Sequence, residues 1–256
     1  MCCVIIGHQQ QKAHMRFNLL TAVNPKTQKG MHRGYMTYVL HLAPSTLSGL
    51  GDVCPQSSAG CRAACLNTAG RGGMFRPGED TNRVQQARIR KTRLFFEDRE
   101  QFMSQLVDDV TRAHRQAIKL GLEQVFRLNA TSDLQWERYT VPGANNIFEL
   151  FPDFQFYDYT KILGRKVSHI PNYHVTFSQS ESNHQLVQRA LDMNLNVAVA
   201  FDQLPDTYLG RPVINGDRDD LRFLDPHGCV VGLKAKGRAR RDHSGFVIRL
   251  KNVQTI

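Results

Sequence analysis

The feature that most constrains the fold is an alternation of short apolar runs with amphipathic helical segments along the chain. Residues 35–44, YMTYVLHLAP, predict a β-strand that ends at Pro44, because aromatic and β-branched residues dominate the run. Residues 101–121 carry apolar side chains at helical spacing and end at Gly121. Strands that alternate with helices pair in parallel, because parallel neighbours need a crossover connection. With about seven or eight candidate strands, the pattern predicts an α/β fold, a single (β/α) barrel or partly open barrel with mostly parallel strands.

The length of the chain fits one domain of this kind. Its 256 residues suffice for a single barrel. We therefore expect one barrel-like domain over residues 1–256, with an N-terminal extension over 1–34 and a Cys/Gly-rich loop over 45–78. No apolar run reaches the roughly 20 residues of a membrane helix, and the first residues lack the basic region and cleavage site of a signal peptide. These features predict a cytoplasmic protein without a membrane partner.

Three cysteines cluster in the stretch CPQSSAGCRAACLNTAGRG, with the spacing C-x6-C-x3-C. In a reducing cytoplasm such a cluster indicates a metal or catalytic site rather than a disulfide framework. Cys54, Cys61 and Cys65 are therefore predicted to ligate either an iron-sulfur cluster or zinc. A closed zinc site needs a fourth protein ligand, for which the candidates are Cys2, Cys3, His32 and His41. Without a fourth ligand, an open coordination position favours a cluster or a catalytic metal.

Polar side chains follow five predicted strands at the point where each apolar run ends. Any one of them has an ordinary structural explanation, such as a helix N-cap. Their recurrence favours a polar pocket at one mouth of the barrel, because barrel enzymes carry catalytic groups at the C-terminal ends of strands. The candidate catalytic residues are Asn129, Ser132, Asp133, Lys161, Ser178, Glu181, Asp202 and Lys234.

The charge of the chain favours a polyanionic partner. There are 33 Lys+Arg against 23 Asp+Glu, a formal net charge of +10. Two basic segments adjoin predicted mouth elements and are suited to contact phosphates. The predicted nucleic-acid-binding residues are Arg88, Arg90, Lys91, Arg93, Lys236, Arg238, Arg240 and Arg241. A base would have to leave its stack to enter a barrel pocket, and the candidate stacking surfaces, which are equally candidates for the core, are Trp136, Tyr157, Tyr159 and Phe177.

Several motifs resemble a tailed-phage family that is named after a gene-88 product. They are NPKTQKG, the cysteine stretch quoted above, RLNATSDLQWE, YDYTK, TFSQSES and GDRDDLRFLDPHGCVVGLKAKG. The resemblance covers residues 24 to about 248. It implies a phage protein, and hence the cytoplasm of the host, but the family name carries no chemistry.

A more distant likeness is to radical-SAM-like barrels, in which a loop after the first strand places three cysteines on a 4Fe-4S cluster and leaves one iron open for S-adenosylmethionine. The position of the cysteine loop fits this likeness. The spacing differs from the usual C-x3-C-x2-C, and RLNATSD stands where a glycine-rich and acidic cofactor motif is expected on the second strand. This likeness implies a 4Fe-4S cluster and S-adenosylmethionine as cofactors. Together with the basic charge of the chain, it favours a nucleic-acid base-modifying enzyme, with DNA favoured over RNA as the partner.

Two alternatives remain. The chain is also similar in architecture to transglycosylases that exchange guanine for a 7-deazaguanine, which implies zinc and a pair of carboxylates, here Asp133 and Asp202. The zinc-binding cysteines of those enzymes lie near the C-terminus, unlike the cluster in this chain. The second alternative is a non-catalytic nucleic-acid-binding protein in which the cysteines hold a structural zinc.

Overall fold

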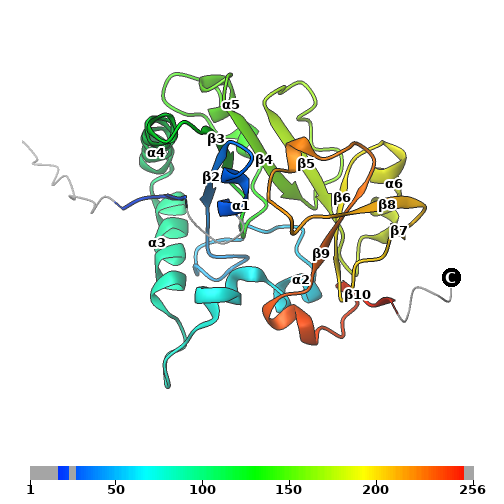
Figure 1. Ribbon diagram of the computed structural model, residues 1–256. Helices are drawn as coiled ribbons and strands as arrows, with labels where there is room; N and C mark the ends of the chain where they lie inside the picture. Colours follow the sequence, from blue (N-terminus) through cyan, green and yellow to red (C-terminus); the bar gives the residue numbers. More distant parts are fainter. Residues whose placement is uncertain (1–16, 23–26, 251–256) are drawn as a thin grey trace, which may run out of the picture.

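The chain folds around one ten-stranded, mostly parallel sheet with helices against it (Figure 1). A computed structural model describes residues 17–22 and 27–250. The strands are β1 (Leu20–Thr21), β2 (Tyr35–Leu40), β3 (Glu123–Arg127), β4 (Gln155–Thr160), β5 (Tyr173–Ser178), β6 (Val197–Phe201), β7 (Thr207–Tyr208), β8 (Arg211–Asn215), β9 (Val230–Lys234) and β10 (Val247–Ile248). The α-helices are α1 (Thr27–Met31), α2 (Ala59–Ala63), α3 (Arg83–Glu97), α4 (Arg99–Lys119), α5 (Ile147–Leu150) and α6 (His184–Asp192). Short 3-10 helices are η1 (Leu66–Thr68), η2 (Gly70–Gly73), η3 (Trp136–Arg138), η4 (Arg222–Leu224) and η5 (Gly237–Arg241).

The strand order is β1-β2-β3-β4-β5-β6-β9-β8-β7, with β10 paired in parallel to β6. From β2 to β8 every neighbouring pair along this path is parallel, and only the edge pairs β1-β2 and β7-β8 are antiparallel. The predicted α/β fold with mostly parallel strands is therefore confirmed. Within the described residues the path of hydrogen-bonded strands is open, since no pairing joins the β1-β2 edge to the β7-β8 edge.

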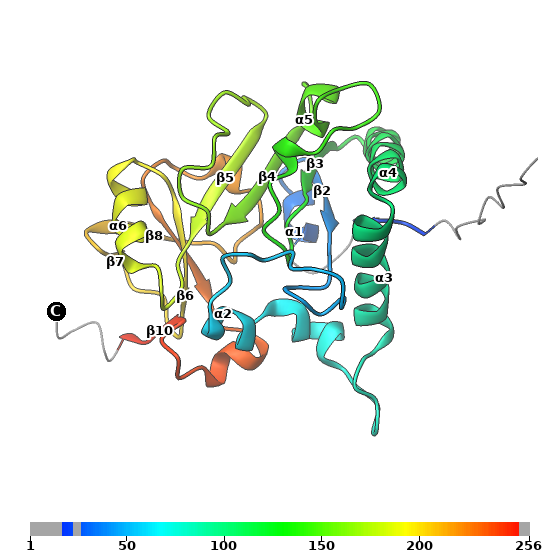
Figure 2. The same ribbon diagram turned by 180° about the vertical axis from the view of Figure 1, so that it is seen from behind.

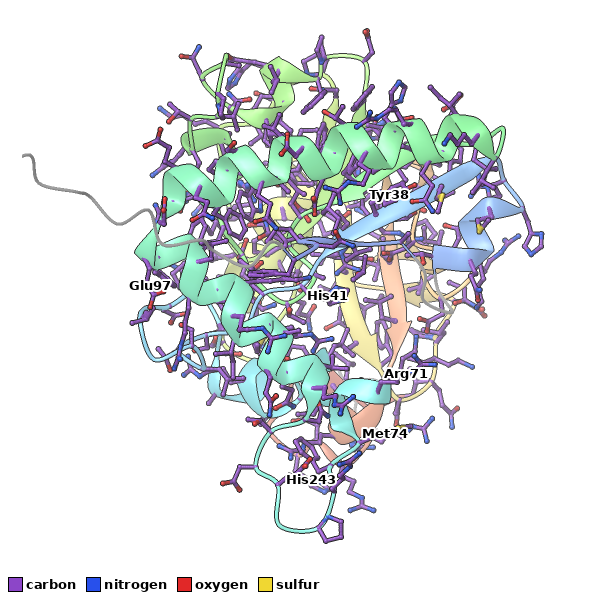
Figure 3. The ribbon with its side chains drawn as sticks, turned by 90° about the vertical axis from the view of Figure 1, so that its left-hand side faces the viewer. Tyr38, His41, Arg71, Met74, Glu97 and His243 are labelled. Atoms are coloured by element: carbon purple, nitrogen blue, oxygen red, sulfur yellow. The ribbon has the colours of Figure 1, made fainter. Side chains whose placement is uncertain are left out.

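Helices cover one face of the sheet (Figure 2). Alternate side chains of the strands, such as Tyr38 and Phe156, lie in a core with the apolar stripe of α4. Figure 3 looks onto α3 and α4, which lie over β2. Helix α4 presents Phe102 and Leu106 to this core, as the helical spacing predicts. Gly121, which follows α4, has a φ of 66°, a backbone conformation that suits glycine at a helix end.

The connection between β8 and β9 covers part of the opposite, inner face. Leu221 packs there with Val125 and Tyr157. Asp220 accepts hydrogen bonds of 3.0 Å from Arg127 Nη1 and from Tyr157 Oη. The inner side chains therefore meet a chain segment rather than a second layer of helices.

The described part of the predicted N-terminal extension belongs to the folded body. Asp109 Oδ2 on α4 accepts hydrogen bonds from the backbone N–H groups of Leu19 (2.6 Å) and Leu20 (3.2 Å). The ammonium group of Lys91, on α3, donates to Leu19 O at 2.6 Å. Two buried charged groups thus hold the segment that begins β1. None of the helices in the described ranges is long and apolar enough for a membrane span.

We expect Lys91→Met to lower the free energy of unfolding by about 1–3 kcal/mol, because the buried carbonyl of Leu19 loses its donor. Chemical denaturation in urea measures this change. Lys119→Met, at an exposed position of α4, is the matched control and should change stability by less than about 0.5 kcal/mol. Equal stability of the two variants would contradict the role given to Lys91.

Candidate functional site

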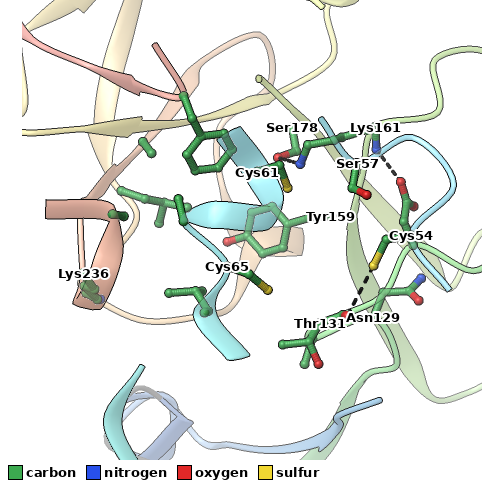
Figure 4. A pocket seen from close by; sticks show the side chains of 18 of the residues that line it. Cys54, Ser57, Cys61, Cys65, Asn129, Thr131, Tyr159, Lys161, Ser178 and Lys236 are labelled. Atoms are coloured by element: carbon green, nitrogen blue, oxygen red, sulfur yellow. Dashed lines mark hydrogen bonds between the residues drawn. The ribbon is translucent and has the colours of Figure 1, made fainter. Parts of the chain in front are cut away.

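A cavity of about 270 Å³ lies at the C-terminal ends of the parallel strands. Its walls come from the ends of β3, β4, β5, β6 and β9 and from the cysteine loop (Figure 4). The predicted site residues in its lining are Cys54, Cys61, Cys65, Asn129, Ser132, Asp133, Lys161, Ser178, Lys234 and Lys236. The structure therefore brings together the cysteine cluster and most of the strand-end residues.

Glu181, which follows β5, fastens the turn that carries Cys61. Its carboxylate accepts hydrogen bonds of 2.7 Å from Ser58 Oγ and from Gly60 N. Ser58 Oγ in turn accepts from Cys61 N at 3.2 Å, as the N-cap of α2. A Cβ at position 60 would lie 2.8 Å from the Glu181 carboxyl carbon, so a larger residue there would have to displace this carboxylate. Glu181 is not in the cavity lining, and its role is to position the thiol-bearing segment.

Cys54 is attached to the turn that follows β3. Its Sγ donates to Thr131 O at 3.4 Å and accepts from Ser45 N at 3.4 Å. The backbone supports the same contact, since Asp133 N donates to Val53 O at 2.7 Å. Two separate strand ends therefore hold the two ends of the cysteine segment.

Burial in the cavity wall favours the protonated thiols of Cys54 and Cys65. Burial raises the pKa of Cys54 to about 12, although the hydrogen bond from the backbone of Ser45 acts to lower this pKa. Burial also raises the pKa of Cys65, while the charges of Arg88 and Lys161 lower it to a smaller extent. A bound cation would reverse this balance, because it favours the thiolate. All cysteines within the described ranges are free thiols, including the buried Cys229.

The sulfurs of the three cysteines line the same cavity. In Figure 4 the side chains of Cys54, Cys61 and Cys65 point toward one shared space. Tetrahedral zinc with Zn–S bonds near 2.3 Å draws its sulfurs to about 3.8 Å from one another. No group of three His, Cys, Asp or Glu side chains in the described residues is arranged to hold such an ion. The described residues therefore give no direct support for a bound metal at the three cysteines.

Neither histidine proposed as a fourth ligand is in the cavity lining. His32 precedes β2 and so lies at the end of the strand away from the cysteine loop. Burial, followed by the charges of Arg88 and Arg127, lowers the pKa of His41 to about 3, which leaves a neutral imidazole. Cys2 and Cys3 fall outside the residues that the structure describes.

Asn129 and Ser132 build the turn after β3. The side-chain oxygen of Asn129 accepts hydrogen bonds from Ser132 Oγ (2.8 Å), Leu134 N (2.9 Å) and Trp136 Nε1 (3.1 Å). Trp136 itself is fully buried. The turn is therefore shaped by one amide, and Asn129, Thr131 and Ser132 form part of a wall of the cavity.

Asp133 and Lys161 place ionisable groups at the cavity wall. Asp133 accepts hydrogen bonds of 2.8 Å from Thr160 Oγ1 and from Lys161 N, and burial raises its pKa. The ammonium group of Lys161 donates to Ser178 Oγ at 3.1 Å. Lys161 thus offers a cation, and Asp133 a carboxyl with increased proton affinity, to a bound molecule.

Asp202 does not share this cavity. Its Oδ1 accepts hydrogen bonds from Gln203 N (2.7 Å) and Leu250 N (3.1 Å), so it ties the end of β6 to the segment after β10. The predicted carboxylate pair with Asp133 is not assembled at one site. The strand-end argument placed Asp202 at the correct edge of the sheet, but the packing of β10 against β6 occupies its side chain.

Arg127 is a cavity residue that the sequence analysis did not select. It ends β3 on the inner face, pairs with Asp220 at 3.0 Å and lies with its guanidinium 4.6 Å from the centre of the Tyr159 ring. Burial acts to lower its pKa, but Asp220 outweighs this and the pKa is raised. A single charged residue inside the apolar run VFRL was the only signal that could have indicated it.

The predicted nucleic-acid-binding residues divide into buried and exposed sets. Lys91 is buried against Leu19, and Arg88 donates to Asn67 Oδ1 at 2.6 Å and so supports the cysteine loop. Lys236 forms an ion pair of 2.6 Å with Asp217 beside the cavity. The side chains that are exposed are Arg90, Arg93, Lys236, Arg238, Arg240 and Arg241.

The sequence matches the family described as Gene product 88 over residues 15–250. The chain belongs to the Gene product 88 family. The resemblance found in the sequence motifs is thereby confirmed. No curated protein and no solved structure gives a match to this chain. Family membership supplies no chemistry, so the function has to be argued from the site.

Asp158, on β4 behind the cavity wall, makes stability depend on pH. Burial raises the pKa of its carboxyl to about 7, whereas an unfolded aspartate ionises near pH 4. Between these values the unfolded chain releases its proton first, so the folded state loses stability as pH rises. From pH 5 to pH 8 we expect a loss of about 2–3 kcal/mol from this carboxyl in urea denaturation. Asp158→Asn should remove that part of the slope, and parallel pH profiles of the two proteins would contradict the assignment.

We expect Glu181→Ala to loosen the cysteine segment without unfolding the sheet, because Ser58 and Gly60 lose their common acceptor. Hydrogen exchange at the amides of residues 58–65 should accelerate about tenfold or more, while exchange in β3 and β4 stays unchanged. Glu149→Ala, which removes a carboxylate that caps α5 through Asn145 and Asn146, is the control. Unaltered exchange over residues 58–65 in Glu181→Ala would show that other contacts hold the loop.

Proposed function

We propose that this chain is an enzyme that modifies nucleic-acid bases, with DNA as the favoured substrate, and that Cys54, Cys61 and Cys65 hold an iron-sulfur cluster at the mouth of the cavity. The observation that carries the proposal is the convergence of the three thiols and the strand-end polar residues on one cavity. Catalytic groups of parallel α/β enzymes gather at this end of their strands.

The chemistry of the donor set supports a cluster. Thiolates are soft ligands that favour iron-sulfur clusters. The cluster proposed here would supply one-electron chemistry on S-adenosylmethionine. Lys161 supplies positive charge to a wall of the same cavity, which suits an anionic substrate.

We further infer that the sheet is a partly open barrel. Tyr159 on β4 packs in one cluster with Ile214 on β8 and Leu233 on β9. All three side chains pack against the buried cluster of Ala198, Cys229 and Val231, and such packing of inner side chains from separate strands favours a curled sheet. A curled sheet focuses the strand ends on a single opening, which favours an enclosed reaction site.

The base-exchange alternative gains no support from the geometry. It requires Asp133 and Asp202 to act on one sugar, and only Asp133 lines the cavity. A structural zinc site gains no support either, because no group of three His, Cys, Asp or Glu side chains in the described residues is arranged to hold an ion.

Protein purified without oxygen should contain iron and acid-labile sulfide and absorb near 400 nm. Cys61→Ser should lose most of this iron while it keeps a folded sheet, because one ligand of the cluster is removed. Iron and sulfide analysis, with circular dichroism as the folding test, measures both outcomes.

Cys229→Ala is the matched control. Cys229 is buried outside the cavity with Ala198 and Val231, and its loss should leave the iron content unchanged. Stoichiometric zinc without iron would contradict the cluster and favour the structural-zinc alternative. Full iron loading in Cys61→Ser would remove the cysteine cluster from the proposal.

A further inference from the structure

We propose that the rim of the cavity binds a single-stranded polynucleotide across a surface built from two chain segments. This inference rests on the proposed function, in which the cavity receives a nucleobase. We call the surface the rim surface, and it consists of Leu66, Arg71, Met74, Phe75, Arg76, Arg238, Arg240 and Arg241.

The two segments of the rim surface lie side by side. A Cβ at Gly237 would lie 3.5 Å from Ala69 Cβ and 3.8 Å from Thr68 O. A Cβ at Gly73, just before Met74, would clash with the same carbonyl oxygen of Thr68. The start of η5 and the end of η2 therefore both approach the backbone at Thr68 and Ala69. Figure 3 shows Arg71, Met74 and His243 at the same end of the molecule.

Buried amides of Asn82, which caps α3, and of Gln85 hold the loop that carries Arg71 and Met74. Asn82 Nδ2 donates to three backbone carbonyl groups of this loop at 2.9 to 3.1 Å. Gln85 Nε2 donates to Gly72 O at 2.8 Å. The loop is thus ordered before any ligand binds, which reduces the entropy lost on binding.

The arginines of the rim surface are available to phosphates. All five side chains are exposed, and none forms an ion pair with another of the described residues. They come from two segments, so the positive charge extends across the rim rather than along one helix. A polyanion that crosses this rim releases counterions at each contact, which makes its affinity depend on salt.

The apolar members of the rim surface select for unpaired bases. Met74 is 70% exposed, Leu66 49% and Phe75 38%. Apolar side chains beside arginines suit a strand whose base faces are accessible, whereas a duplex buries these faces in its stack. Leu66 also lines the cavity, so the apolar part of the surface leads into it. The cavity volume of about 270 Å³ lies just below the roughly 300–1,000 Å³ of pockets for drug-sized ligands, which suits a single base.

Fluorescence anisotropy of the full, anaerobically purified chain tests this proposal. The probes are a fluorescein-labelled 20-nucleotide DNA strand, the RNA strand of the same sequence and the DNA duplex. We expect a single strand to bind at least about tenfold more tightly than the duplex, and the DNA and RNA arms identify which polynucleotide is preferred. Met74→Ala/Phe75→Ala should weaken single-strand binding about tenfold and leave the salt dependence unchanged.

Charge variants separate the rim surface from the overall basicity of the chain. Arg238→Ala/Arg240→Ala/Arg241→Ala should lower the slope of log affinity against log salt by about 2, since each single-strand phosphate contact contributes about 0.7. Arg115→Ala/Lys119→Ala, two exposed cations on α4, should alter neither slope nor affinity. Thermal unfolding confirms that each variant is folded.

Equal affinity for duplex and single strand, an apolar variant with unchanged affinity, or an equal effect of the α4 control would overturn the proposal. The binding of oligonucleotides and the iron content of the chain are measured separately. Oligonucleotide binding by a chain without iron would contradict the proposed function alone, whereas an iron-loaded chain that fails to bind either strand would contradict the rim surface alone.

Discussion

The carboxylate of Glu181 is the contact on which the rest of the site depends. It fixes Ser58 and Gly60 over the end of β5 and thereby sets the position of Cys61. The opposite end of the segment is tied to the turn after β3 through Cys54 and Thr131. Between these attachments the chain crosses the strand ends and closes one side of the cavity. If either end of this loop were unattached, the C-terminal ends of the strands would be open to solvent and the site would not be enclosed.

The two faces of the sheet pack against different parts of the chain. The outer face packs its aromatic and aliphatic side chains against α3 and α4 and provides most of the core. The inner face is filled along much of its length by the β8-β9 connection, where Arg127, Tyr157 and Asp220 form a buried polar group. Because this packing fills the interior, the accessible space remains at the C-terminal ends of the strands, where the thiols and Lys161 lie.

Much of this arrangement could be predicted from the sequence because it follows from local pattern and from the polarity of parallel strands. The run 35–44 indicated a strand, and the strand-end rule brought Asp133, Lys161 and Ser178 to one edge. The rule could not say which side chains point into the cavity, because that depends on contacts between distant segments. Asp202 is taken up by the segment after β10.

Residues whose roles depend on tertiary packing were the hardest to assign. The sequence indicated that Lys91 belongs to a basic surface. In the structure Lys91 lies on the buried side of α3 and contacts Leu19. Arg127 stood alone in an apolar run, and only the return of the β8-β9 connection gives it a partner in Asp220. Cys61 was assigned correctly to the cavity because its segment had to follow a strand end, although the Glu181 contact that fixes it could not be foreseen.

The most direct measurement of the central claim is anomalous diffraction at the iron absorption edge from crystals grown without oxygen. The account predicts an iron peak in the cavity among the sulfurs of Cys54, Cys61 and Cys65, and crystals with no iron at that position would contradict it.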